Sequence, residues 1–341
     1  MKKNKMRVKR FFKYFGIAIA ILIMGFLIVA QIAYQSIPQI EPPGKMYPVN
    51  GEEIHMYCTG PEDNSKPTII IISGGSTPSF VYFDLQEKLS ETVRTCTYDT
   101  AGNGWSPAND IPYTTKNLSN ELYLLLQSAK IDGPIILAGH SLGGIVSLIY
   151  SAEHEEQVAG IAFIDSSHYN QYDYFGKEYR DATFNQIEEY LPYVWLIELR
   201  SNLGVSKLMA IFDTSMSEEQ VEEHSMLESI HRWNSPYSTM KSMASNLKLS
   251  FEQGKEVHYD RGDLPIIVLS AGSPVVSDSQ EIEGISTEEF RKGFDILQKD
   301  LAGLSSNGKH VFVNGTNHGS IVYNDETADH ILSLIPLIEE K

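Results

Sequence analysis

Short apolar runs alternate with longer amphipathic stretches along most of the chain, and this alternation predicts strands followed by helices. The apolar runs that predict buried strands lie at 54–58, 68–72, 93–98, 135–138, 158–164, 264–270 and 310–313. The stretches that predict helices lie at 83–89, 118–129, 290–304 and 328–337. Strands that alternate with helices are typical of a mostly parallel sheet with helices on both faces. We therefore expect an α/β domain over residues 49–341.

The alternation is interrupted between residues 169 and 259. This segment is rich in aromatic, Met and acidic residues, and it has helix-like stretches near 184–202, 216–231 and 236–253. We interpret it as a helical cap inserted over the sheet, where it would line a substrate pocket and restrict water. Its large side chains are candidates for lining that pocket: Tyr172, Tyr174, Trp195, Met209, Phe212, Trp233 and Tyr237.

The amino-terminal segment contains an uncharged apolar run at 15–34, preceded by a basic segment at 1–14. At 1.5 Å per residue the run spans about 30 Å, the thickness of a bilayer core. We expect an uncleaved single-pass anchor that leaves the basic segment in the cytoplasm and the rest of the chain outside. Secretion after signal-peptide cleavage is the alternative, although the run is long for a signal peptide and no clear A-x-A site follows it. Residues 35–48, with four prolines, are predicted to form an extended linker.

Composition and charge narrow the class of protein. The chain has 341 residues, of which 42% are hydrophobic and 21% charged, as expected for a globular protein. Seven of its 27 Lys and Arg residues lie in 1–14, whereas none of its 44 Asp and Glu residues does. The remaining chain is therefore strongly acidic, which argues against nucleic-acid binding. The sequence has no cluster of metal-ligand residues and no dinucleotide-binding loop, so we expect no metal and no cofactor.

The strongest chemical signal follows the predicted strand at 135–138, in the segment 139–143, GHSLG. An apolar stretch with helical spacing comes next, so the order is strand, G-x-S-x-G, helix, which is the nucleophile elbow. The glycines allow a sharp turn that exposes the hydroxyl of Ser141, and the start of the helix directs backbone N–H groups at the reacting centre. We predict that Ser141 is a nucleophile, with an ordinary strand-to-helix turn as the alternative.

Two backbone N–H groups are candidates for stabilising an oxyanion. The strand at 68–72 runs into the segment 73–76, SGGS, where a pair of glycines lets the backbone approach a ligand closely. In acyl-transfer enzymes such a loop supplies one donor, and the residue after the nucleophile supplies the other. We therefore predict that the N–H groups of Gly75 and Leu142 form an oxyanion hole.

A serine hydroxyl needs a base within hydrogen-bond reach. Of the ten histidines, His318 follows the last predicted strand on a glycine-flanked loop, and it comes third in the order serine, acid, histidine. We predict that His318 is this base. The side chain of His140 is expected to point away from the hydroxyl, and His168 is expected to lie near the acid.

Four features occur in a fixed order along the chain: SGG at 73–75, D-x-x-G-x-G-x-S at 99–106, the elbow around Ser141, and N-H-G at 317–319. With these features the chain resembles the α/β-hydrolase superfamily, of the AB hydrolase-1 type, over about residues 45–341. It is similar to secreted or membrane-anchored bacterial hydrolases with an apolar anchor and a Cys in the second and fourth core strands. The resemblance implies the fold but not a substrate, because this fold hosts many chemistries.

The resemblance implies two positions for the acid of a catalytic triad. Most members place it after the strand that follows the cap, but the segment at 271–278 has no carboxylate where its turn begins, and Asp278 comes several residues later. Some members, including pancreatic-type lipases, place it after the strand that follows the elbow, which is Asp165 here. We prefer Asp165, which would orient His318 and stabilise its charged form, and keep Asp278 as the alternative.

The resemblance also bears on the only two cysteines, Cys58 and Cys96. In the resembling fold their strands are antiparallel neighbours, and thiols outside the cytoplasmic membrane tend to oxidise. We therefore predict a disulfide between them, with two buried thiols as the alternative.

These predictions together indicate a serine hydrolase that cleaves a small-molecule carboxylic ester, or an amide, through an acyl-enzyme. Ser141 would attack, His318 would carry the proton, and Asp165 would orient His318. A cofactor-free haloperoxidase or a peptidase would use the same residues. A hydrolase-like binding protein without turnover is an alternative of a different class, and the intact Ser141 and His318 weigh against it.

Overall fold

The computed structural model describes residues 2–63, 65–205, 207, 209, 226, 227, 229, 230, 236–257, 260–272 and 285–339, with the backbone alone at 2–6. The chain divides into two compact units. One unit comprises Met1–Glu41 and Tyr193–Trp233, and the other comprises Pro42–Pro192 and Asn234–Lys341.

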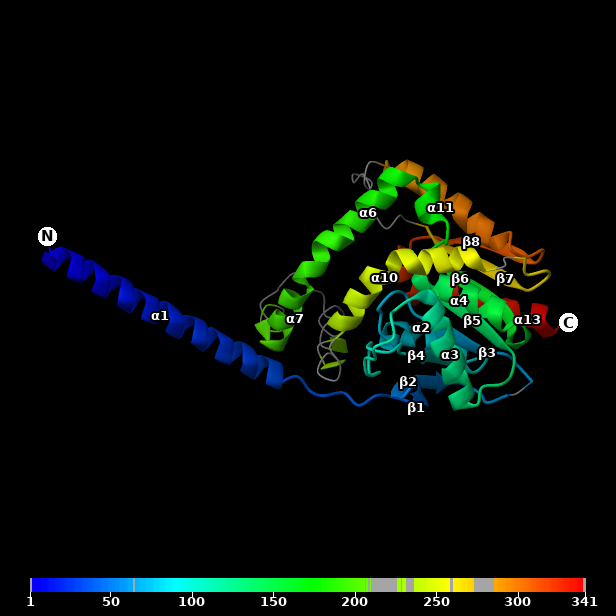
Figure 1. Cartoon of the computed structure of the whole chain (residues 1–341). Coiled ribbons are helices and arrows are strands. Elements are labelled where there is room, and N and C mark those ends of the chain that lie inside the picture. The colour runs from blue at the N-terminus through cyan, green and yellow to red at the C-terminus, as the bar shows by residue number, and fades with distance from the viewer. Residues whose placement is uncertain are drawn as a thin grey trace. The chain divides into compact units, whose positions relative to one another are not determined.

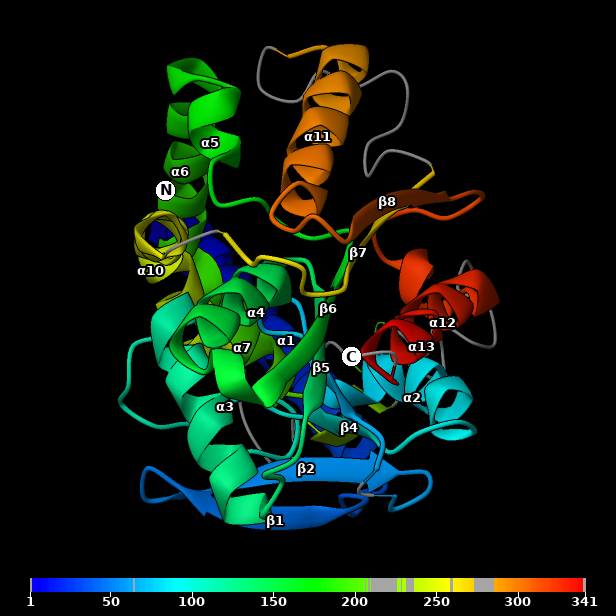
Figure 2. The same ribbon diagram turned by 90° about the vertical axis from the view of Figure 1, so that its right-hand side faces the viewer.

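An eight-stranded sheet forms the centre of the second unit, with the strand order β1-β2-β4-β3-β5-β6-β7-β8 (Figure 2). β2 is antiparallel to both of its neighbours, and every pairing from β4 to β8 is parallel. The strands are β1 (Lys45–Val49), β2 (Glu52–Thr59), β3 (Thr68–Ile72), β4 (Thr95–Tyr98), β5 (Ile135–His140), β6 (Val158–Ile164), β7 (Ile266–Ala271) and β8 (Gly308–Val313).

Helices cover both faces of this sheet. In Figure 2, α3 (Thr115–Ala129) and α4 (Leu142–Glu153) lie on one face. The opposite face carries α2 (Phe83–Ser90), α12 (Asp325–Leu332) and α13 (Leu334–Glu339).

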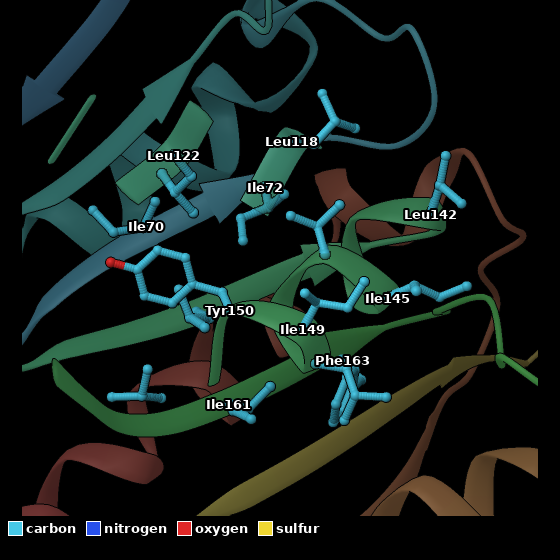
Figure 3. Packing of buried hydrophobic residues seen from close by; sticks show 14 of the residues in the cluster. Ile70, Ile72, Leu118, Leu122, Leu142, Ile145, Ile149, Tyr150, Ile161 and Phe163 are labelled. Carbon is cyan, nitrogen blue, oxygen red and sulfur yellow. The ribbon is translucent and has the colours of Figure 1, made fainter. Parts of the chain in front are cut away.

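Because successive side chains of a strand point to opposite faces, a strand covered on both sides must be apolar throughout. In β3, Ile70 and Ile72 join the core under α3 and α4, whereas Ile69 and Ile71 join the core under α2 and α12. Figure 3 shows the first of these cores, to which Ile70 of β3 and Tyr150 of α4 both belong.

The predicted fold class is confirmed, with two local differences. β1 overlaps the end of the segment predicted as a linker, where Pro48 hides the strand signal. An edge strand tolerates proline because one of its sides makes no ladder hydrogen bonds. The helix predicted at 328–337 is two helices, α12 and α13, separated at Ser333.

The described part of the segment after β6 is largely helical, as its pattern predicts. α5 (Gln171–Tyr174), α6 (Lys177–Tyr190) and α10 (Tyr237–Glu256) belong to the second unit, and α10 packs on α3 and α4. The helix-like stretch at 216–231 lies almost entirely outside the described residues. After β7, α11 (Thr287–Ala302) packs on β7 and β8.

The first unit contains α1 (Lys2–Gln35) and α7 (Val194–Asn202) (Figure 1). Within the described residues, α1 is the one helix long and apolar enough to cross a membrane, over Arg7–Gln35. Gly204, just after α7, packs so closely on α1 that a Cβ there would collide with Ala30 and Tyr34. The segment after α7 is thus held against the carboxyl-terminal part of α1.

The predicted disulfide is present in the structure. Cys58 of β2 and Cys96 of β4 are direct partners in the register of the two antiparallel strands, and their sulfur atoms are bonded. The bond ties the amino-terminal strand pair to the parallel part of the sheet.

Candidate active site

Ser141 occupies a sharp turn between β5 and α4, with a φ of 53°. The glycines on either side are required by close approach. A Cβ at Gly139 would collide with the hydroxyl of Ser147 and the backbone of Gly143, and a Cβ at Gly143 would collide with the carbonyl oxygens of Ile72 and Ser73. The elbow therefore holds Ser141 in a backbone conformation that places it at the carboxyl end of the central strand.

His318 lies on the loop after β8, and its Nδ1 is 2.6 Å from Oδ2 of Asp165. Asp165 follows β6 directly, and its Oδ1 accepts the backbone N–H of Ala271 at 3.0 Å. Asp165 is buried and His318 is half-buried. The carboxylate thus binds Nδ1 and leaves Nε2 of His318 for another partner. Asp278, the alternative acid, lies outside the described residues.

Ser141, Asp165 and His318 line one cavity of about 240 Å³. Its apolar walls are Phe290 and Phe294 from α11 and Phe312 from β8, while Arg291, Gln171 and Asp295 add polar groups.

The walls differ from the predicted ones. None of the described members of the predicted set lies among the residues lining this cavity, and Phe212 and Trp233 lie outside the described residues. Tyr172, for example, is buried against Tyr179, Phe184 and Phe251. The sequence predicts Tyr172 as a pocket wall, whereas in the structure it is a core residue.

Two backbone N–H groups near Ser141 are available as donors. Leu142 is the first residue of α4, where N–H groups have no partner within the helix. Within the described part of the chain, no acceptor is hydrogen-bonded to the N–H of Gly75 or of Leu142. The neighbouring N–H groups are in use, because Gly74 donates to the hydroxyl of Tyr82 at 2.9 Å and Ser76 donates to that of Tyr113 at 3.0 Å.

Both ring nitrogens of His140 contact groups other than Ser141, in agreement with the expectation that this ring points away from the Ser141 hydroxyl. Its Nδ1 is 2.9 Å from the hydroxyl of Tyr82, and its Nε2 is 2.9 Å from the carbonyl oxygen of His318. Burial, followed by repulsion from His318, lowers the pKa of His140 to about 4, so its ring is neutral near pH 7. His168 hydrogen-bonds Asp300 at 3.0 Å and not Asp165.

The D-x-x-G-x-G-x-S loop is organised by its first residue. Asp99 is fully buried and accepts the N–H groups of Ser79 at 2.6 Å and Trp105 at 3.1 Å, and it also contacts Nδ1 of His55 at 2.8 Å. A carboxylate with three donors and no access to solvent holds a loop in place.

A second serine–histidine contact in the same cavity was not predicted. Oγ of Ser270, in β7, is 2.9 Å from Nε2 of His310, and Nδ1 of His310 is 3.8 Å from Asp295. Ser270 and Asp295 both line the cavity. Burial lowers the pKa of His310, which favours its neutral form. Among the described residues, no group of three or more His, Cys, Asp or Glu side chains is arranged to hold a metal ion.

Comparison with known proteins agrees with this architecture. The model of the alpha/beta hydrolase fold family matches residues 67–191, which include the elbow and Asp165. An uncharacterised protein of Schizosaccharomyces pombe is 23% identical over 327 residues, which cover 86% of this chain and 55% of the relative, so the chain spans about half of that protein.

Solved structures share the fold at low sequence identity. A putative lipase from Acinetobacter baumannii superimposes with a TM-score of 0.59 at 18% identity, covering 93% of this chain and 96% of its own. An esterase from Thermogutta terrifontis gives a TM-score of 0.56 at 16% identity, covering 86% and 98%. Together with the strand order, the elbow and the matched family model, these likenesses show that the chain has the alpha/beta hydrolase fold.

Proposed function

We propose that this protein is a serine hydrolase that cleaves a carboxylic ester, or less readily an amide, with Ser141, His318 and Asp165 as its catalytic triad. The observation that carries the proposal is the 2.6 Å contact between His318 and Asp165, which line the same cavity as Ser141. A buried carboxylate on Nδ1 fixes the tautomer in which Nε2 accepts a proton.

The proposed reaction has two halves. Nε2 of His318 takes the proton from Oγ of Ser141 as this oxygen attacks the ester carbonyl, and the N–H groups of Gly75 and Leu142 receive the oxyanion. His318 then donates its proton to the leaving alcohol, which leaves the acyl group on Ser141. Water then attacks the acyl group as His318 takes its proton, and His318 returns this proton to Oγ of Ser141 as the acid leaves.

The cavity supports a short apolar acyl group. Its volume of about 240 Å³ is below the range of roughly 300–1,000 Å³ that is usual for pockets of drug-sized ligands. Three phenylalanines from α11 and β8 supply the walls. We therefore propose that small esters are preferred over long-chain lipids.

We also propose that α1 anchors the protein in a membrane, with the hydrolase unit outside the cytoplasm. The apolar side chains of α1 are exposed, which water disfavours but a bilayer core accommodates. Tyr193, Trp195 and Leu199, in the same compact unit, are also exposed, and Trp195 is 59% exposed. Gly204 holds this segment against the carboxyl-terminal part of α1, where aromatic residues would meet the lipid headgroups.

The test is covalent labelling with a fluorophosphonate probe, followed by turnover of p-nitrophenyl esters of graded acyl length. Ser270→Ala is the matched control for Ser141→Ala, because both serines line the same cavity. We expect wild type and Ser270→Ala to be labelled and Ser141→Ala to remain unlabelled. Labelling of folded Ser141→Ala at the wild-type rate would contradict the proposal, and unlabelled wild type would favour a binding protein.

A further inference from the structure

Three hydrogen bonds connect the loop of Gly75 to the loop of His318 through two buried side chains. The N–H of Gly74 contacts the hydroxyl of Tyr82 at 2.9 Å, and that hydroxyl contacts Nδ1 of His140 at 2.9 Å. Nε2 of His140 then contacts the carbonyl oxygen of His318 at 2.9 Å. Tyr82 comes from the segment before α2, and His140 is the last residue of β5. The two loops are therefore joined beside the elbow.

The chemistry of the groups gives every bond one direction. A carbonyl oxygen only accepts, so Nε2 of His140 carries the proton and donates it to His318. Because burial keeps the pKa of His140 at about 4, the ring is neutral and Nδ1 is an acceptor for the hydroxyl of Tyr82. Burial also raises the pKa of Tyr82, so its phenol remains a donor, and its oxygen accepts the N–H of Gly74.

We propose that Tyr82 and His140 are positioning residues that hold the oxyanion donor Gly75 and the base His318 in fixed places relative to Ser141. This inference rests on the proposed function. Gly74 precedes Gly75 directly, and the carbonyl that accepts from His140 belongs to the base itself. Movement of either loop therefore stretches the same chain of bonds.

The neutral ring of His140 has a second consequence. The centroids of the His140 and His318 rings are 4.7 Å apart. When His318 becomes positively charged during acyl transfer, a neutral neighbour does not oppose that charge, whereas a second cation would.

The experiment compares Tyr82→Phe and His140→Gln with Tyr150→Phe in the full-length chain in detergent. Tyr150 is a matched control because it is also buried and its hydroxyl also makes a hydrogen bond, to Gln157 at 2.6 Å, outside the site. A misplacement of about 1 Å costs roughly 10²-fold in rate. We expect kcat to fall 10- to 100-fold in the two site variants, with KM within threefold of wild type, and Tyr150→Phe to keep its kcat.

The double variant Tyr82→Phe/His140→Gln separates positioning from general destabilisation. Because both changes break the same chain of bonds, the double variant should lose no more than the worse single variant, whereas independent effects would multiply. A merely structural role would lower all thermal midpoints and leave the kcat of folded enzyme within threefold of wild type, which would overturn the proposal.

Nitrogen-15 NMR of the histidine rings gives a readout that needs no turnover. His140→Gln and His318→Gln assign the two rings. We expect one His140 tautomer, protonated at Nε2, from pH 5.5 to 8, and we expect Tyr82→Phe to shift the ring signals of His318. If wild type hydrolyses no ester, the proposed function fails. The positioning of His318 by Tyr82 and His140 is still tested by this shift of the His318 signals. Unchanged His318 signals in Tyr82→Phe would overturn it.

Discussion

The buried carboxyl group of Glu121 predicts how the stability of the protein depends on pH. This residue of α3 is only 5% exposed, and its carboxylate accepts the N–H of Ala101 at 3.1 Å. It borders a small cavity of about 80 Å³ that it shares with Thr239 and Ser242 of α10. Burial raises the pKa of Glu121 from 4.5 to about 7, although the bond from Ala101 acts in the opposite direction.

The sign of the effect on stability follows from proton binding. Between pH 4.5 and about 7 the folded protein holds a proton on Glu121 that the unfolded chain has lost. The free energy of unfolding therefore falls as the pH rises, and the contribution is complete below about pH 4.5 and lost as the pH passes about 7. At about 1.4 kcal/mol per pH unit, the change amounts to about 3 kcal/mol.

The assay compares the thermal midpoints of wild type and Glu121→Gln from pH 4.5 to 8 in a non-ionic detergent. The amide of this variant would keep an oxygen for the N–H of Ala101 but would not titrate. We expect wild type to lose stability relative to the variant by about 3 kcal/mol as the pH rises, or roughly 6–12 °C at 2–4 °C per kcal/mol.

The contribution of His140 to stability must be separated from that of Glu121, because it changes with pH in the opposite direction. Its pKa is lowered from 6.5 to about 4, so its contribution is present above pH 6.5 and is lost as the pH falls through about 4. Both proteins retain His140, so it cancels in their difference. Glu87→Gln, at an exposed position of α2, is the control and should run parallel to wild type. Parallel profiles for Glu121→Gln as well would refute the argument.

Four further outcomes are expected. Ser141→Ala should lower kcat by a factor on the order of 10⁶ with an unchanged thermal midpoint, as measured by ester turnover and calorimetry. Asp165→Asn should lower kcat by roughly 10⁴ while Asp278→Asn keeps most of it, and the reverse result would move the acid to Asp278. Reduction of the disulfide, which joins positions 38 residues apart, should cost up to about 4 kcal/mol in a denaturant titration. In vesicles, lipids brominated near the headgroup should quench wild-type fluorescence more than that of Trp195→Phe; equal quenching would remove Trp195 from the interface.

Local signals made the elbow predictable from the sequence. An apolar run, glycines at two fixed positions around Ser141 and a helical stretch are all read within about 20 residues, and the structure explains both glycines by collisions with nearby backbone and side chains. The same holds for central strands such as β6, which is apolar throughout because both of its faces are covered.

The cavity walls were not predictable in this way. Phe290 and Phe294 lie one turn apart on α11, a spacing that indicates a helix face but not what that face covers. The sequence analysis predicts that aromatic residues of the segment at 169–259 line the pocket. In the structure, Tyr172 instead packs against aromatic side chains of α6 and α10. Which helix lies over a catalytic serine depends on tertiary packing, and composition does not encode it.

The contact between Tyr82 and His140 could not be predicted from the sequence either, because 58 positions separate the two residues and neither has a local signature of this contact.

For Asp165 the sequence contained a weak signal, which was the lack of a carboxylate where the segment after β7 begins. The structure supplies a physical reason for preferring it. The N–H of Asp165 donates to the carbonyl of Leu269 at 2.7 Å, and its Oδ1 accepts from Ala271, so the end of β7 holds this residue from both sides.

With Asp165 as the proposed acid, the segment after β7 does not need to supply a carboxylate to His318. Because β6 is the direct neighbour of β5, Asp165 leaves the sheet one strand away from Ser141, and Ser141 in turn donates its N–H to the carbonyl of Ile164 at 3.2 Å. The proposed nucleophile Ser141 and the proposed acid Asp165 are therefore fixed to each other by adjacent backbone, and only His318 must be brought in from β8. The chain of bonds from Gly74 through Tyr82 and His140 supplies that remaining constraint. If this view is right, His318 is the member of the proposed triad whose placement is most sensitive to distant substitutions.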